Sequence, residues 1–181
     1  MRATLKPHPD TPAPAGARIE AEALRPTPGS LQLRYRLIMN GPAVRMPPPA
    51  AFERADDLWR HTCFEAFIRG DGQAYCEINL SPSGQWATYW FDDYRQGMRA
   101  AACEPSALDA AAPDGSFDLT AEIDLRRLPA PFDGPLSLGL SAVIEDESGG
   151  KTYWALAHAP GKPDFHHPDA FALDLPFVEP A

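Results

Sequence analysis

The residues best suited to chemistry lie in one stretch, TCFEAFIRGDGQAYCEINLSPSGQWATYWF, which runs from Thr62 to Phe91. Glu65, Glu77 and Asn79 occur there among aromatic and aliphatic residues, along what read as three consecutive strands. Two neighbouring carboxylates can accept hydrogen bonds from a polyhydroxylated ligand, share a proton, pair with a cation, or serve as the acid and base of a glycosidase. Which of these roles applies depends on the face of the strands that carries the two carboxylates.

The first turn sets the pairing of the first two strands. A three-residue loop, Gly70–Gly72, pairs Arg69 with Gln73, because a glycine accepts the left-handed backbone that such loops need. In this register Glu65 lies directly opposite Glu77. One face then holds a consistent set of core residues: Phe64, Ala66, Ile68, Ala74, Cys76 and Ile78.

The second turn, SPSG, fits a four-residue loop that pairs Leu80 with Gln85. The face opposite the core then carries a polar row between two rows with aromatic residues. The three rows are Cys63, Asn79 and Trp86; Glu65, Glu77 and Thr88; and Phe67, Tyr75 and Trp90. Such a surface offers polar groups on an apolar floor, as small-ligand sites do.

Two glutamates facing each other at ~5 Å are destabilising unless something compensates them. A cation, a shared proton or a polyhydroxylated ligand could do so, and so could an arginine close in sequence: Arg54, Arg60, Arg95 or Arg99. The alternative is a structural or protein-interaction domain with an internal Arg–Glu network. Trp86 and Trp90 on the same face favour a ligand, because large exposed apolar patches usually mark contact surfaces.

The rest of the chain alternates with a period of two, which predicts strands with one buried face. This holds for GARIEAEA, LQLRYRLI, FDLTAEIDL, LSLGLSAVI, KTYWALAH and FALDLPF, whereas AAFERADDLWR and PSALDAAA could form a helical turn or two. We expect one all-β domain over 1–181, an antiparallel β-sandwich of about nine to eleven strands with little helix. The proline-rich segment MNGPAVRMPPPA is expected at an edge or as a covering loop, because prolines lack donors.

Composition limits the function classes. The 181 residues carry a formal net charge of −9, which argues against nucleic-acid binding. No apolar run approaches the length of a membrane span, and the N-terminal stretch has no secretory h-region. Three cysteines without zinc-ligand spacing suggest reduced thiols, so we expect a cytoplasmic protein.

In these motifs the sequence resembles DOMON-like domains, the superfamily that includes family 9 carbohydrate-binding modules and cytochrome-type haem-binding domains. The matching pieces are LWRHTCFEAFI, AYCEINLSPSGQWATYWFDDYRQGM and YWALAHAPGKPDFHHPDAF, in the order of the bacterial single-domain subgroup. The resemblance implies a sandwich with a ligand pocket on the concave face of one sheet. It also implies site residues matching those that surround the sugar in sugar-binding relatives: Trp59, Glu65, Glu77, Asn79 and Trp154.

Haem is a third possibility, because haem-binding relatives clamp the iron between a methionine and a histidine. The candidates are His158, His166, His167, Met39, Met46 and Met98, and no pair of them aligns with the family pattern. The stretch PDFHHPDAF could also ligate a metal, but adjacent histidines point to opposite sides of an extended chain. We expect an ordered loop there, in which Phe165 fills the sandwich end and one histidine bonds to the backbone.

An enzyme is not predicted. Strand neighbours can reach the ~5–5.5 Å of a retaining glycosidase, which leaves a glycosidase-like use of Glu65 and Glu77 open, but few loops are long enough to build a cleft. Cys63 and Cys76 lie on strands, away from any helix N-terminus that would activate a thiol.

We therefore predict a non-catalytic domain that binds a small ligand, a saccharide or sugar-like polyol, without a cofactor, metal, nucleic acid or membrane. The residues expected to stack on the ligand are Trp59, Tyr75, Trp86, Trp90 and Trp154. Those expected to bond its hydroxyls are Glu65, Glu77, Asn79 and Thr88, with Arg54 or Arg95 balancing the carboxylates.

Overall fold

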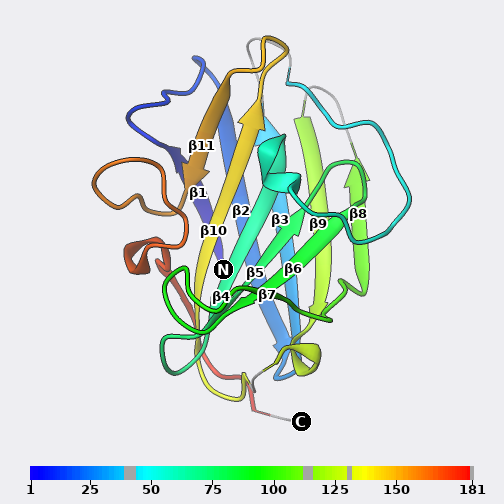
Figure 1. The fold of residues 1–181 in the computed structure, drawn as a ribbon, viewed down its shortest axis with the longest axis vertical. Coiled ribbons are helices and arrows are strands. Elements are labelled where there is room, and N and C mark those ends of the chain that lie inside the picture. The colour runs from blue at the N-terminus through cyan, green and yellow to red at the C-terminus, as the bar shows by residue number, and fades with distance from the viewer. Residues whose placement is uncertain (39–43, 112–115, 130–131, 180–181) are drawn as a thin grey trace.

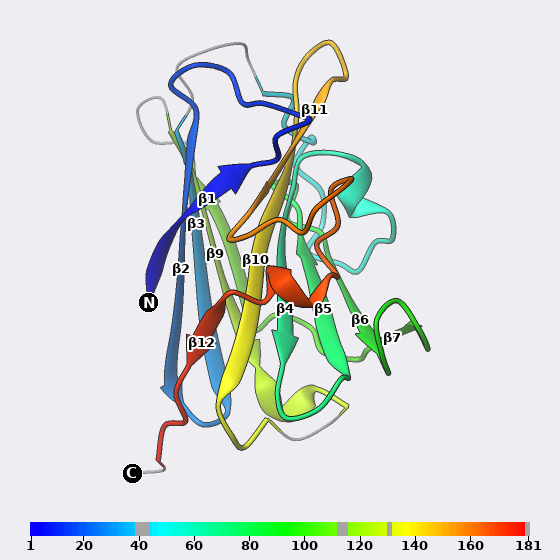
Figure 2. The ribbon, with the colours of Figure 1, turned by 90° about the vertical axis from the view of Figure 1, so that its left-hand side faces the viewer.

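Two layers of antiparallel strands pack face to face in the computed structural model (Figures 1 and 2), which describes residues 1–38, 44–111, 116–129 and 132–179. In the order of pairing, the first layer contains β1 (Arg2–Pro7), β2 (Arg18–Thr27), β3 (Ser30–Ile38), β9 (Ser116–Asp124) and β8 (Ala107–Ala111). The second contains β7 (Arg99–Ala100), β6 (Trp86–Phe91), β5 (Tyr75–Leu80), β4 (Cys63–Arg69), β10 (Leu136–Glu145) and β11 (Lys151–Ala155). A last strand, β12 (Leu173–Leu175), pairs with the start of β10.

The strand β1 joins the two layers. Its residues from Arg2 to Leu5 pair with β2, and Lys6 and Pro7 pair with β11. The helical content of the described chain is three short 3₁₀ turns: η1 (Leu58–Arg60), η2 (Leu125–Arg127) and η3 (Pro168–Ala170). The predicted all-β sandwich is confirmed, with twelve strands in the described residues, two of which have three residues or fewer.

Alternation along the strands explains the core between the layers. In β3 the residues Leu31, Leu33, Tyr35 and Leu37 are buried, and the residues between them are exposed. Since successive side chains of a strand point to opposite faces, this pattern turns one face of the first layer to the second. The tyrosine reaches across, and its hydroxyl donates to the backbone carbonyl of Glu65 in β4 at 2.7 Å.

One helical expectation is wrong. Within PSALDAAA, residues Ala107–Ala111 form β8, an edge strand that pairs with β9, because their backbone completes the ladder beside Leu119 and Ala121. Of the other segment, AAFERADDLWR, only the residues of η1 are helical.

The second layer differs from the first because its strands are buried on both faces. All residues of β5 and β6 are buried, and so are six of the seven in β4. A strand buried on both sides needs a cover on its outer face. That cover comes from Leu58 of η1 and from Phe165 and Phe171 in the 156–172 connection between β11 and β12, which we call the covering segment. It runs along the β10–β11 side of the second layer (Figures 1 and 2).

The proline-rich segment is not this cover. Its described part begins at Val44, which bridges to Asp146, and continues to the turn before β6, where the backbone N–H of Ala50 donates to the Ser83 carbonyl. Met39 and the residues up to 43 lie outside the described residues. No helix in the described ranges is long and apolar enough to cross a membrane.

Candidate functional site

The pairing of β4 with β5 differs from the predicted register by two residues. Glu65 lies opposite Asn79, and Glu77 lies opposite Phe67, so the two glutamates are diagonal neighbours and not a facing pair. The loop is longer than predicted because pairing stops at Arg69 and Tyr75. A shift of two residues keeps every side chain on its face. The predicted faces are therefore correct, and the predicted pairing of Glu65 with Glu77 is wrong.

The pairing of β5 with β6 differs by one residue, and this reverses the faces of β6. Ser81 donates to the carbonyl of Gln85, which leaves a three-residue loop with Gly84 in the left-handed region, φ 93°. Asn79 then pairs with Ala87 and Glu77 with Tyr89. The predicted placement beside the glutamates is wrong for Trp86, Thr88 and Trp90, which point into the core between the layers.

In that core the three residues have structural partners. Trp86 and Trp90 belong to the main hydrophobic cluster, with Trp90 stacked edge-on against Phe132 at a centroid distance of 6.3 Å. The hydroxyl of Thr88 donates to the carbonyl of Cys103 at 2.7 Å. These contacts place all three away from any ligand on the outer face.

The outer face of the second layer, which we call the site face, carries one polar row across its central strands. Ser141 of β10, Glu65 of β4 and Asn79 of β5 are successive cross-strand partners. Alanines stand at both ends of this row, Ala155 of β11 and Ala87 of β6. Partners of this kind have side chains ~5 Å apart on one face, so the three polar groups form a continuous strip between small residues.

Aromatic side chains surround the strip. The rings of Tyr75 and Phe91 stack with centroids 4.8 Å apart, and His166 from the covering segment meets Phe67 and Phe91 edge-on at 5.0 Å. Phe171 lies edge-on to Tyr75 at 5.6 Å. The polar strip thus lies within a second hydrophobic cluster, separate from the core between the layers.

Glu65 is the most isolated group of the strip. It is 3% exposed, and its carboxylate receives no hydrogen bond from any residue of the described chain. Burial, with a smaller effect from the neighbouring Glu77, raises the pKa of Glu65 well above its ordinary value. The folded, ligand-free protein therefore favours the protonated form of this acid more than the unfolded chain does.

Ser141 is the second isolated group. Its side chain is buried, at 2% exposure, and its hydroxyl has no hydrogen-bond partner among the described atoms. Buried hydroxyls nearly always have a partner, and leaving one without costs about 1–3 kcal/mol. Two adjacent buried polar groups, Glu65 and Ser141, are thus left without partners on the site face.

Glu77 is better supported. Its Oε1 accepts from the Asn79 amide at 2.6 Å, and its Oε2 lies 3.6 Å from Nε2 of His166. Burial raises the pKa of Glu77 to about 7, against the lowering effects of that amide and of Arg95. Near pH 7 this acid is therefore close to half ionised.

His166 ties the covering segment to the site face. Its Nδ1 lies 2.8 Å from the hydroxyl of Tyr75, which accepts from the backbone N–H of Arg95 at 3.2 Å. Burial raises the pKa of Tyr75 to about 12 and lowers that of His166 to about 4, so the phenol donates to a neutral ring. The Nε2–H then faces Glu77, and this contact is not a charged pair at pH 7.

The arginines do not balance the glutamates as predicted. Arg54 pairs with Asp56 at 2.7 Å, Arg60 with Asp57 at 3.2 Å, Arg95 with Asp164 at 2.8 Å and Arg99 with Asp92 at 2.9 Å. Within the described residues, no arginine forms an ion pair with Glu65 or Glu77. Arg95 acts on Glu77 only at longer range, and its ion pair with Asp164 anchors the covering segment.

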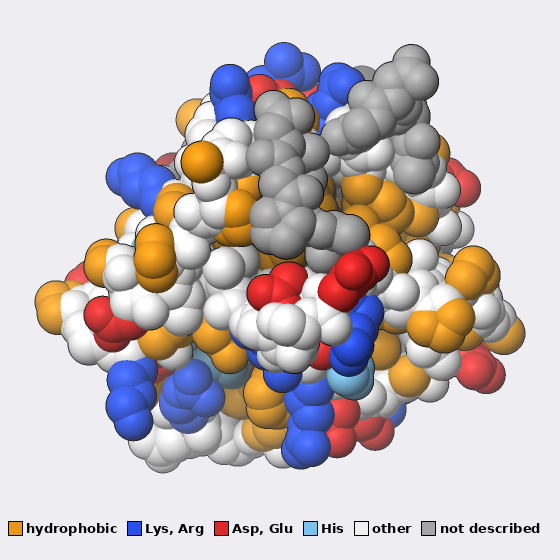
Figure 3. All heavy atoms as spheres, turned by 90° about the horizontal axis from the view of Figure 1, so that it is seen from above, with side chains coloured by type: hydrophobic (Ala, Val, Ile, Leu, Met, Phe, Trp, Pro, Cys, Tyr) orange, Lys and Arg blue, Asp and Glu red, His pale blue; other side chains and the backbone are white. Residues whose placement is uncertain are grey.

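The two tryptophans that the resemblance implies do not meet. Trp154 is 2% exposed and lies in the core between the layers, where its Nε1–H donates to Thr152 at 2.9 Å. Trp59 is 47% exposed on η1, with Arg60 over its ring at 5.4 Å. Seen from above, the end of the molecule carries hydrophobic side chains among charged ones (Figure 3). The Trp59 ring is thus available at the surface, and the Trp154 ring is not.

The histidine motif forms an ordered loop, as predicted. Phe165 is buried, but it packs on the site face and not at the sandwich end. His167 accepts from the backbone N–H of Asp169 at 3.2 Å and caps η3, which confirms one histidine bonded to the backbone. No group of three or more His, Cys, Asp or Glu suited to a metal occurs in the part of the chain that the structure describes.

Sequence reasoning missed four residues of the site face: Ser141, Tyr89, Phe91 and Phe171. A signal for Ser141 was present, because the serines and glycine in LSLGLSAVI alternate with leucines and mark an outward face. For Tyr89 and Phe91 the register error removed the signal.

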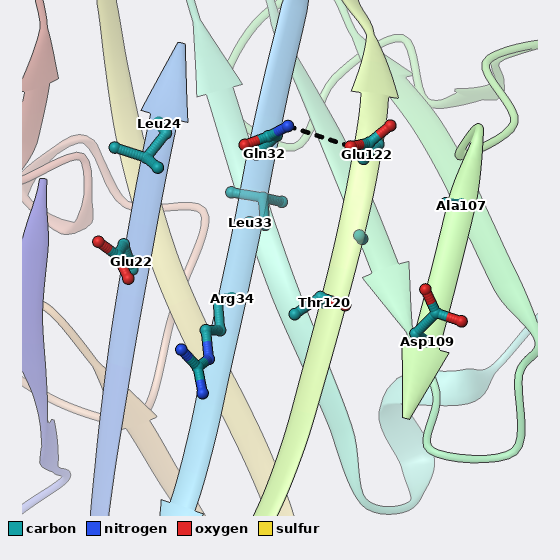
Figure 4. A pocket seen from close by; sticks show the side chains of 10 residues that line it. Glu22, Leu24, Gln32, Leu33, Arg34, Ala107, Asp109, Thr120 and Glu122 are labelled. Carbon is teal, nitrogen blue, oxygen red and sulfur yellow. Dashed lines mark hydrogen bonds between the residues drawn. The ribbon is translucent and has the colours of Figure 1, made fainter. Parts of the chain in front are cut away.

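A separate cavity of about 280 Å³ lies on the outer face of the first layer (Figure 4). Its polar side chains largely pair with each other or with near neighbours: Gln32 donates to Glu122 at 3.0 Å, and Arg34 pairs with Asp118 at 3.1 Å. These are ordinary cross-strand pairs of a solvated sheet face. The cavity therefore has fewer unsatisfied groups than the site face.

Comparisons with solved structures show what the sandwich is similar to. A protein of Bacteroides uniformis ATCC 8492, described as a "putative carbohydrate-binding protein", has a TM-score of 0.69 at 13% identity, over 96% of this chain and 86% of that one. A family 9 carbohydrate-binding module of Caldicellulosiruptor kristjanssonii, in complex with glucose, has a TM-score of 0.56 at 10% identity, over 93% of this chain and 81% of that one.

The chain has the fold of a carbohydrate-binding module. A family 9 module from the same Caldicellulosiruptor species in complex with cellotriose agrees, with a TM-score of 0.52 at 10% identity, over 82% of this chain and 70% of that one. No protein-family model matches the sequence, and no curated protein matches it. At these identities the likeness establishes the fold alone.

Proposed function

We propose that this protein is a non-catalytic domain that binds a saccharide or sugar-like molecule on the site face. The observation that carries the proposal is a pair of adjacent buried residues: Ser141, whose hydroxyl is buried without a partner, and Glu65, whose carboxylate receives no hydrogen bond from the described chain. A buried polar group without a partner is unfavourable unless another role retains it. A ligand hydroxyl placed between the two would donate to one and accept from the other.

The surroundings suit a sugar ring. Asn79 extends the polar strip, and the alanines at its ends leave room beside it. Phe67 and Tyr89 stand in the next row of the same face, opposite Glu77 on either side, and offer apolar ring faces beside the strip. A few oriented polar groups on an aromatic floor are characteristic of small-ligand sites.

The solved structures support the same class of ligand. Two of the similar structures hold glucose or cellotriose, and the third is described as carbohydrate-binding. Membership of the DOMON-like superfamily is part of the same proposal. The polar strip of this chain supports saccharide binding independently of those names.

Ligand entry requires the covering segment to move. The segment has 17 residues, and loops longer than about 12–15 residues are usually functional, as lids or binding loops. Its side-chain polar anchors are few: Asp164 on Arg95 and Tyr94, His166 on Tyr75 and Glu77, and His158 on the carbonyl of Lys6. A ligand that replaces the contacts of His166 would be enclosed between the segment and the strip.

The test is a thermal-shift and calorimetric screen of neutral and amino mono- and disaccharides. A ligand of the folded state stabilises the protein by RT ln(1 + [L]/Kd), about 2.7 kcal/mol at 100 times Kd. We expect a saturable rise in Tm with ligand concentration. In calorimetry, Ser141→Ala and Glu65→Gln should each lower the affinity at least tenfold. Ser137→Ala is the matched control, because it lies on the same strand and face but bonds Asp174 at the far end.

A flat response to the whole panel would contradict the proposal. The interpretation as a structural or interaction domain would then gain, supported by the closed site face and by the exposed hydrophobic residues Met46, Phe52 and Trp59. We also expect any disaccharide that binds to remain intact. Hydrolysis that Glu65→Gln abolishes would instead assign the carboxyl groups a catalytic role.

A further inference from the structure

The charges on the site face are unbalanced in the ligand-free protein. Two carboxyl groups, Glu65 and Glu77, lie under the cover, and no lysine or arginine of the described chain forms an ion pair with either. The nearest arginine, Arg95, is committed to Asp164, and Arg54 to Asp56. The face therefore has two potential negative charges and no cation to meet them.

The site face also has more hydrogen-bond acceptors than free donors when Glu65 is ionised. Ionised, the Glu65 carboxylate is a pure acceptor, the Ser141 hydroxyl has free lone pairs, and Glu77 Oε2 has only the long 3.6 Å contact with His166. The one strong donor on the strip, the Asn79 amide, is already used by Glu77. A ligand with more donors than acceptors would satisfy this set.

The aromatic wall favours a positive charge as well. The rings of Phe67, Tyr75, Phe91 and Phe171 surround the glutamates, and ring faces attract cations within about 6 Å. Cations of the protein already use the rim of this cluster: Arg69 lies 4.4 Å over Phe171 and Arg54 lies 5.3 Å over Tyr89. The interior of the cluster has no such occupant among the described residues.

We propose that the ligand of the site face carries an ammonium group, and that an amino sugar is its saccharide form. The ammonium would donate to Glu65, Ser141 and Glu77 while the rest of the ring lies against the aromatic residues. This inference rests on the proposed function, because it specifies the ligand of the same site. The positive charge of the ligand would favour the ionised form of both carboxyl groups.

A metal ion fits the site less well. Calcium needs six to eight oxygen ligands, and the amide of Asn79 presents its nitrogen to Glu77 and its oxygen to the thiol of Cys63. Rings occupy most of the remaining surroundings. A compact organic cation needs fewer acceptors, and the aromatic walls suit it.

The test compares three sugars by isothermal titration calorimetry at pH 7: glucosamine, N-acetylglucosamine and glucose. N-acetylation removes the charge and two donors while it keeps the ring. We expect glucosamine to bind at least tenfold more tightly than either neutral sugar. Glu65→Gln should remove that preference, and the exposed carboxylate variant Glu104→Gln should retain it.

The outcomes separate this inference from the proposed function. Equal affinity for glucosamine and a neutral sugar, or a preference that survives Glu65→Gln, would overturn the ammonium assignment and leave saccharide binding standing. Failure of all three sugars and of the wider panel would refute both. Saturable calcium binding that Glu65→Gln abolishes would also overturn the assignment, in favour of a metal.

Discussion

Replacing Glu77 with glutamine should remove a loss of stability that the wild type undergoes as the pH rises. The folded state holds this proton to about pH 7, whereas the unfolded chain releases it near the ordinary value of 4.5. The stabilising contribution of the protonated form is complete below pH 4.5 and is lost as the pH rises through 7. The glutamine variant has no such loss, and it retains the oxygen that accepts from Asn79.

The magnitude follows from the two pKa values. At about 1.4 kcal/mol per pKa unit, the full loss is about 3.5 kcal/mol, and about 2.5 kcal/mol of it falls between pH 5 and pH 9. Any change in packing caused by the amide is independent of pH and cancels in that difference. Removing the negative charge of Glu77 also lowers the pKa of Glu65, which further reduces the variant's loss of stability at high pH.

Urea unfolding of the wild type and of Glu77→Gln at pH 5, 7 and 9 measures this difference. His166 is present in both proteins, so its own titration is common to both curves. Glu104→Gln, at an exposed position, is the control and should follow the wild type within about 0.5 kcal/mol at each pH. Parallel curves for wild type and Glu77→Gln would refute the conclusion that burial holds a proton on this carboxyl group.

Three further changes test other parts of the structure. Tyr35→Phe removes the buried bond to the Glu65 carbonyl and should lower the unfolding free energy by about 1–2 kcal/mol in urea titration; an unchanged midpoint would contradict that bond. Gly97→Ala should cost a similar ~1–2 kcal/mol, because φ is 66° and the new Cβ would come within 2.2 Å of Asp92 Oδ2; an unaffected Tm would contradict the turn geometry. Asp164→Ala should speed hydrogen exchange in the covering segment and leave the β4–β5 amides protected, and uniform protection would show that this anchor is dispensable.

The fold was predictable because its signal is repeated in every strand. Alternation in β2, β3 and β9 identifies the buried faces, as Ile19, Tyr35 and Leu119 illustrate. Proline and glycine mark the turns between them. Such a pattern tolerates local errors, since each strand provides its own evidence.

The site was harder to predict because it depends on loop lengths. The loop after Arg69 is longer than the sequence suggests, yet a shift of two residues kept Glu65 and Asn79 on the predicted face. The loop before Gln85 is one residue shorter than predicted, and that difference moved Trp86 and Trp90 into the core. The sequence alone does not distinguish a three-residue from a four-residue loop before Gln85, because serine, proline and glycine fit both lengths.

The cover was not predictable from local pattern. His166 reaches Tyr75 over a separation of 91 residues, and the pairing depends on how the covering segment folds back over the site face. The contact holds the covering segment against that face, on which both glutamates are buried. A carboxyl group that reads as surface in the sequence therefore has a raised pKa in the folded chain.

The positions of the four tryptophans determine what optical spectroscopy can report. Trp86, Trp90 and Trp154 are enclosed between the layers, and Trp59 alone is exposed to solvent. Because indole emission shifts to longer wavelengths on contact with water, unfolding should give a large red shift from the three enclosed rings. A Trp59→Phe variant would make emission a pure reporter of sandwich integrity, and the native Trp59 signal, isolated by difference, would follow events near η1.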